Sequence, residues 1–190
     1  MAIRDGVLPW ISGKLPNHKA RTNNPSDSAK KLQIQSKVNK IRMTQYIDQG
    51  PMILSIDVFD VPIGDEDIRL VNNGTSCGLN DVMWAPWFPL PTVNTHLRGV
   101  EAGTSMADLD VSDHFHNFMI HQTIQPYVGV NFTNYPRNQK LDEMPIWDIK
   151  WDESRCETLG ERFNRNCMGL VSSAYNSVQG LHWAEETVSK

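Results

Sequence analysis

The sequence has no excess of positive charge, because its 18 Lys and Arg residues are outnumbered by 22 Asp and Glu residues and the formal net charge is −4. A uniformly basic surface for nucleic acid is therefore excluded for the chain as a whole, although a local basic face is not. Cysteine is scarce, with three residues and no CxxC spacing. That count excludes a disulfide framework and a cysteine-rich zinc module, and it favours a reducing compartment.

Long apolar runs are also missing. No run approaches the roughly 20 residues that a membrane span needs, and the first residues lack the apolar core of a signal peptide. We therefore expect an intracellular protein, in the cytoplasm or the nucleus, with no membrane partner.

What is present is an ordinary globular composition, with 39% apolar and 21% charged residues in 190, enough for about one domain. Residues 1–25 hold several Gly and Pro residues without an apolar period, so we expect a tail or an arm there. A helix is expected next, because Ile34, Val38 and Ile41 recur at helical spacing before the Gly-Pro pair at 50–51. This helix is the most basic segment, which we interpret as a solvated face, with a nucleic-acid contact as the alternative. Its basic residues are Lys30, Lys31, Lys37, Lys40 and Arg42.

A hairpin and two irregular segments follow this helix. Leu54, Ile56 and Val58 alternate with polar residues, which predicts a strand that turns near Gly64 and returns at 68–71. The next segment, 72–80, has loop composition, and its glycines Gly74 and Gly78 are expected to need special backbone dihedral angles.

The segment 84–92 holds three prolines, which excludes a helix interior or a central strand. Because the segment is apolar, we expect it to cover another part of the protein. We also expect the six Trp and six Phe residues to be buried.

The second half of the chain alternates strand and helix signals, and with the hairpin it predicts an α+β fold in which a small sheet packs on helices. The expected elements are strands at 104–111, 127–132 and 146–151, a helix or tight turn at 113–121, a polar helix at 157–166, a loop around Gly169, and a helix at 174–187.

Candidate metal ligands are concentrated at 106–121, where three Asp and three His residues occur in sixteen positions. Asp108 and Asp110 lie two residues apart on the predicted strand, so they share one face and could hold Mg²⁺ for phosphoryl transfer. The alternative is an exposed pair that caps the following turn. Asp113 could be the N-cap of the turn that contains His114 and Phe115.

Three histidines offer a second kind of metal site. His114, His116 and His121 could bind a transition metal together with a carboxylate. On a helix, however, His114 and His116 point in different directions, and on a strand His121 leaves their common face. Surface histidines, or histidines bonded to neighbours, are the alternative.

One run carries a family resemblance. In LDVSDHFHNFMI, residues 109–120, an Asp follows a Leu and an aromatic residue stands five positions later. This run resembles motif A of retroelement reverse transcriptases. In that resemblance Asp110 matches the metal-binding aspartate, and Phe115 matches the aromatic residue that screens the sugar 2′ position.

Three further segments fit the same family in the same order, so that the resemblance covers about residues 50–187. FPLPT (88–92) is similar to the Pro-rich segment ahead of motif A, and IRLVNNGTSCGLN (68–80) resembles a segment of the polymerase fingers. CMGLVSSAYNSVQG (167–180) is similar to motif B, whose helix supports template and incoming nucleotide.

The resemblance implies the N-terminal part of an RNA-directed DNA polymerase, a nucleotidyltransferase, from a retrotransposon. The implied architecture is a partial right-hand fold, with a helix and a fingers-like region at 26–100 and an incomplete palm at 101–190. The implied partners are template–primer nucleic acid and deoxynucleoside triphosphates, and the implied cofactor is Mg²⁺ or Mn²⁺. The metal would be held by Asp110, the catalytic carboxylate, and by the carbonyl of Val111. The incoming nucleotide would be bound by Arg69, Asp113, Phe115, Met168 and Gly169.

Several features depart from the family pattern. No Tyr-x-Asp-Asp motif occurs, so the second catalytic carboxylate is missing. We therefore expect a weakly held metal, a fragment that is inactive alone, and an exposed sheet edge that favours self-association. Ile63 stands where the family usually has a Lys that meets phosphate, Asn72 where Asp is common, and Ala174 where Pro is usual.

Two alternatives to a polymerase fragment remain open. One is a non-catalytic module derived from such an element, which binds nucleic acid or protein. The other is a metal-dependent enzyme that uses the three histidines and an aspartate.

Overall fold

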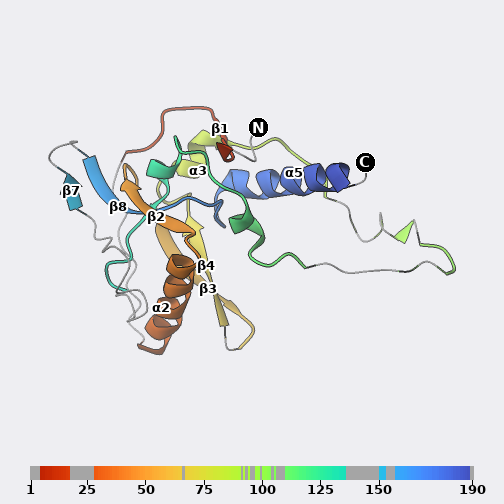
Figure 1. Ribbon diagram of the computed structural model, residues 1–190, viewed down its shortest axis with the longest axis horizontal. Helices are drawn as coiled ribbons and strands as arrows, with labels where there is room; N and C mark the ends of the chain where they lie inside the picture. The colour runs from red at the N-terminus through yellow and green to blue at the C-terminus, as the bar shows by residue number, and fades with distance from the viewer. Residues whose placement is uncertain are drawn as a thin grey trace.

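The computed structural model describes residues 5–17, 28–65, 67–90, 92, 94, 97–98, 100–103, 105, 110–135, 150–152 and 157–188. Within these residues the protein combines helices with antiparallel strand pairs, in agreement with the predicted α+β class (Figure 1). The elements in chain order are β1 (Trp10–Ile11), α2 (Ser28–Met43), β2 (Ile47–Pro51), β3 (Asp57–Ile63), β4 (Asp67–Asn73), α3 (Leu79–Val82), β5 (Met83–Trp84), the 3₁₀ turns η1 (His114–Asn117) and η2 (Gln125–Tyr127), β6 (Gly129–Val130), β7 (Lys150–Asp152), β8 (Glu157–Phe163) and α5 (Val171–Val188).

Strand β8 is the strand around which the four-stranded sheet forms, because β2, β6 and β7 all pair with it in antiparallel fashion. The polar helix predicted at 157–166 is therefore wrong. Its polar residues are accommodated by tertiary pairing: Glu161 forms a buried ion pair with Arg42 of α2, and Arg162 pairs across the strands with Asp48 at 2.9 Å. Intrinsic helix preference is too weak to oppose such pairing.

Helix α2 is shorter than predicted, because it ends at Met43 instead of continuing to the Gly-Pro pair at 50–51. The N–H of Tyr46 donates to the carbonyl of Ile41, and the N–H of Gln45 donates to that of Arg42. Gln45 has a φ of 56°, so these bonds form a Schellman cap with glutamine in the left-handed position that glycine usually takes. The following residues then form strand β2.

The predicted hairpin is confirmed as β3 and β4, which pair from Asp57↔Asn73 to Ile63↔Asp67. Helix α2 lies alongside this hairpin, and the two are linked by an ion pair between Lys30 and Asp60 at 2.8 Å (Figure 1). Leu54 and Ile56 precede the strand proper and are buried in the core.

The two glycines of the 72–80 loop differ in what they require. Gly78 has a φ of 73°, as expected, but Gly74 does not have a positive φ. Gly74 is constrained by close packing, because a Cβ there would approach the Asn80 side chain to 2.8 Å and Leu170 to 2.9 Å. Residues 84–90 form neither a helix nor a central strand, as predicted, and Trp84 belongs only to the short β1–β5 ladder.

The hydrophobic core forms between α2, the sheet and the β3–β4 hairpin, and its fully buried members include Val38, Ile47, Leu54, Val128 and Val130. The expectation that the tryptophans are buried is wrong for those whose exposure is described, because at least half of each of four side chains is exposed, and Trp87 is 86% exposed. Trp84 and Trp87 belong to the Pro-rich segment, which runs over the surface and contacts α5 where the Phe88 and Tyr175 ring centroids are 5.7 Å apart. The exposed tryptophans are Trp10, Trp84, Trp87 and Trp183.

The strands and the helix expected in the second half of the chain are only partly covered by the described residues. The strand expected at 127–132 is reduced to β6, and the helix expected at 174–187 is confirmed as α5, which begins at Val171. Most of the strand expected at 104–111, including Asp108, lies outside the described residues, as do residues 146–149 and Cys156; Asp110 and Val111 are not in a strand.

The two described cysteines, Cys77 and Cys167, are free and buried. Burial raises the pKa of Cys167 to about 12, so its thiol stays protonated and unreactive. Among the described helices, none is both long and apolar enough to cross a bilayer.

Candidate functional site

A cleft of about 470 Å³ opens between α2, the β3–β4 hairpin and the loop 110–117. Six of the seven site residues expected from the sequence line this one cleft, although they come from three separate segments of the chain. They are Arg69, Asp110, Val111, Asp113, Phe115 and Met168. Gly169, the seventh, follows Met168 directly and does not itself line the cleft.

The loop that carries the acidic residues enters the cleft without regular structure and then forms η1. Asp110 is exposed at the cleft and Val111 is half-buried beside it. Asp113 occupies the position before η1, as predicted, but its side chain does not cap the turn. The φ of Asp113 is 50°, a left-handed conformation that a non-glycine residue adopts only when its surroundings hold it there.

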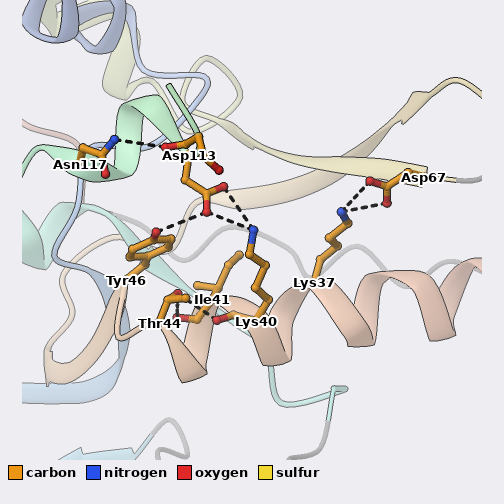
Figure 2. A network of polar contacts seen from close by, with 9 residues as sticks. Lys37, Lys40, Ile41, Thr44, Tyr46, Asp67, Asp113 and Asn117 are labelled. Carbon is orange, nitrogen blue, oxygen red and sulfur yellow. Dashed lines mark hydrogen bonds and ion pairs between the residues drawn. The ribbon is translucent and has the colours of Figure 1, made fainter. Parts of the chain in front are cut away.

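Helix α2 holds the Asp113 carboxylate. Lys40 Nζ lies 3.0 Å from Asp113 Oδ2, and Tyr46 Oη donates to the same oxygen at 3.4 Å (Figure 2). Partial burial by itself raises the pKa of Asp113, but the hydrogen bond and charge of Lys40, with smaller contributions from His116 and Tyr46, lower it below its ordinary value overall. The carboxylate is thus turned towards α2 as an anion.

Ring stacking also supports this loop, through the same Tyr46 that donates to Asp113. The His116 ring is stacked on Tyr46, with centroids 4.6 Å apart and an interplanar angle of 4°, and Phe163 lies 6.1 Å away. Burial lowers the pKa of His116, and the charge of Asp113 only partly opposes that shift. Burial also raises the pKa of Tyr46, so both rings are neutral near pH 7. The loop is therefore fixed by an ion pair and a neutral stack.

The three histidines do not converge on one point. His114 makes edge contacts with Phe115 and Phe118, His116 is in the stack, and His121 shares a hydrogen bond of 2.9 Å with Thr123. Within the described ranges, no three His, Cys, Asp or Glu side chains are grouped in a way that could hold a metal ion.

One wall of the cleft is cationic. Lys37 and Lys40 project from the same side of α2, and Arg69 is exposed on β4. Lys37 Nζ lies 2.8 Å from Asp67 Oδ1 (Figure 2). The basic helix is thus only partly the solvated face expected from the sequence, because its lysines pair with the hairpin and the loop. The spacing of three residues between Lys37 and Lys40 was the available signal, since it places both on one helix face.

Met168 lines the cleft, and backbone contacts hold it and the adjacent Gly169 in place. The N–H of Asn72 donates to the Met168 carbonyl at 2.9 Å, and Asn80 Nδ2 donates to the Gly169 carbonyl at 2.9 Å. Gly169 has a φ of 103°, and a Cβ there would collide with the Asn72 carbonyl oxygen. The motif B-like segment is therefore fixed against the end of β4 by contacts that only glycine permits.

No protein-family model and no curated protein sequence matches this chain. Solved structures are similar in fold. The foamy viral protease-reverse transcriptase in complex with an RNA/DNA hybrid aligns over 92% of this chain, with a TM-score of 0.60 and 12% identity. Two complexes of the foamy viral enzyme with double-stranded DNA align over 94% and 90% of the chain, with TM-scores of 0.56 and 0.53 and 13% identity in each case.

These alignments span 20 to 29% of the length of the three viral chains. At this level of identity the likeness concerns the fold alone, and it confirms the reverse-transcriptase-like fold expected from the sequence.

Proposed function

We propose that this chain is the fingers-and-palm portion of a retroelement reverse transcriptase and that its cleft binds an incoming deoxynucleoside triphosphate beside a template–primer. The observation that carries the proposal is the convergence of residues from three motif-like segments, around 69, 110–115 and 168, on one cleft. Motifs matched by chance would have no reason to meet in one cavity of the size that small ligands occupy.

Each lining residue has a role that its chemistry supports. The Arg69 guanidinium matches the geometry of a phosphate group, and the Phe115 ring offers a flat surface to the sugar. Met168, together with the adjacent Gly169, would contact the base and ribose. Because the Asp113 carboxylate is bonded to Lys40 and Tyr46, this residue would meet the triphosphate through its backbone.

The oxygen donors at the mouth of the loop suit a hard divalent cation. Mg²⁺ is commonly held by one or two protein carboxylates, with substrate phosphates and water completing its coordination. Asp110 supplies an exposed carboxylate and Val111 a backbone carbonyl, whereas the Asp113 carboxylate is already engaged. When bound, Mg²⁺ or Mn²⁺ would neutralise charge that develops during nucleotidyl transfer.

Because these 190 residues contain no Tyr-x-Asp-Asp motif, we expect them to bind nucleotide weakly with the metal and to carry out little synthesis by themselves.

A direct binding measurement tests this function. Thymidine triphosphate is titrated into the protein by calorimetry in the presence of Mg²⁺ or Mn²⁺, and the titration is repeated with Asp110→Asn. We expect measurable binding by the wild type and a loss of about tenfold or more in the variant, since a charge-assisted contact contributes about 1.5–3 kcal/mol.

The matched control is Asp81→Asn, which removes one exposed carboxylate on α3 outside the cleft. Failure of the wild type to bind any nucleotide, or equal losses in the two variants, would refute the proposed function.

A second observation favours an interaction module as the alternative function. A groove of about 620 Å³ runs between the N-terminal segment and α5, and Trp10, Tyr175 and Trp183 line it. Exposed aromatic surface of this kind is typical of protein contacts. Self-association through it would appear in sedimentation velocity as a mass that rises with concentration, and Trp183→Ser should abolish that rise.

A further inference from the structure

The tip of the hairpin carries no Lys or Arg between Val61 and Ile68. Ile63 lines the cleft and lies opposite Asp67 in the β3–β4 register. This end of the cleft therefore offers an apolar side chain from β3 and a carboxylate from β4. Neither group attracts a polyphosphate, and Asp67 would repel one.

Lys37 brings a positive charge to the same place from a different element. Its ammonium group lies 2.8 Å from one Asp67 oxygen and 2.9 Å from the other, and its side chain lines the cleft together with Ile63. Figure 2 shows Lys37 reaching from α2 to the hairpin, one helical turn before Lys40. Helix α2 thus supplies the cation that β3 lacks.

The two lysines of this wall are held with different firmness. Lys40 contacts a carboxylate that also accepts from Tyr46 and belongs to a loop fixed by stacking. The partner of Lys37 is an exposed carboxylate, 58% accessible, near the turn of a hairpin. Ion pairs exposed in this way contribute little to stability. Lys37 can therefore leave Asp67 and contact a stronger anion at a small cost in free energy.

We propose that Lys37 is a phosphate-binding residue of the cleft, which exchanges the Asp67 carboxylate for a phosphate oxygen when a nucleoside triphosphate binds. This inference rests on the proposed function of the cleft. An ammonium group has three donors and no fixed plane, so it can move between two oxygen partners by rotation of its flexible stem. A triphosphate carries several negative charges and competes well against one exposed carboxylate.

Nucleotide titrations with charge variants of Lys37 and Asp67 test the exchange. Lys37→Met should weaken binding of thymidine triphosphate about tenfold and should weaken binding of the monophosphate much less, because only the longer phosphate chain reaches the hairpin tip. Lys37→Arg should retain most of the affinity. Asp67→Asn should strengthen triphosphate binding by a few fold, because it removes the competing anion.

Lys30→Met is the matched control, since it removes another ion pair between α2 and the hairpin, and Lys30 does not line the cleft. Equal losses in Lys30→Met and Lys37→Met would overturn the assignment of Lys37. So would unchanged triphosphate affinity in a folded Lys37→Met protein in which Asp110→Asn still impairs binding. If the wild type binds no triphosphate at all, the proposed function fails and this inference fails with it.

Discussion

Replacement of Arg42 by Met should destabilise this protein more than the loss of any other single ion pair described here. The side chains of Arg42 and Glu161 are 5% and 3% exposed, with Arg42 Nε donating to Glu161 Oε1 at 2.7 Å and Arg42 Nη2 donating to Oε2 at 3.0 Å. Arg42 Nη1 also donates to the Tyr135 carbonyl at 2.7 Å. Removal of one partner leaves a buried charge without compensation, which costs about 3–5 kcal/mol.

That cost is a large fraction of the 5–15 kcal/mol that typically separates folded from unfolded states. Urea denaturation followed by circular dichroism measures it as a drop in the transition midpoint at constant slope. Lys30→Met is the control, because the Lys30 side chain is 43% exposed and that of its partner Asp60 is 10% exposed, so loss of this partly exposed pair should cost clearly less than loss of Arg42.

A double variant separates charge burial from packing. Arg42→Met combined with Glu161→Leu removes both charges, so it should be more stable than Arg42→Met alone, because no isolated carboxylate remains in the interior. The reasoning would be refuted if Arg42→Met cost no more than Lys30→Met, or if the double variant lost the sum of the two single losses.

Three further perturbations have defined outcomes. Gly169→Ala should cost about 1–3 kcal/mol in urea denaturation, since it combines a φ of 103° with a collision at the Asn72 carbonyl; no loss would contradict the close approach. Burial lowers the pKa of His116 below 6.5, so the unfolded chain binds the proton more readily, and stability that is complete above pH 6.5 should fall as the pH drops below it. His116→Phe should flatten that fall, and a variant with an unchanged pH profile would exclude His116 as its source. Tyr46→Phe should speed hydrogen exchange of the amides at 112–117, because it removes a hydrogen bond to Asp113; equal exchange in the variant would show that this hydrogen bond does not hold the loop.

Local pattern was sufficient to predict those parts of the fold whose stabilising contacts are local. The hairpin alternates apolar and polar residues around a Gly64 turn, and α5 has a sustained helical composition, so both are confirmed. Six residues that the family resemblance singled out line one cleft, and four of them come from the single run between Asp110 and Phe115, whereas their roles stay predictions.

The errors concern features that depend on distant partners or that carry no signal in the local sequence. The sequence of β8 has the composition of a polar helix. It forms a strand because its charged residues pair with Arg42 and Asp48, which lie far away in the sequence. The end of α2 depends on a left-handed Gln45, for which the sequence carries no glycine signal. The sequence led us to expect a solvated basic face on α2. In the structure, three lysines of this helix form ion pairs with carboxylates on the hairpin and the loop.

Helix α2 has a consequence for how such a sequence can change over evolution. Four of its basic residues each contact a different place: Lys30 and Lys37 reach two points of the hairpin, Lys40 reaches the loop, and Arg42 reaches the sheet. Insertion or deletion of one residue within the helix would turn every later side chain by about 100° and misalign these contacts together. The hairpin turn at Gly64 has open space around it and can absorb changes of length. Related sequences should therefore vary in length at the hairpin tip and keep the spacing within α2 constant.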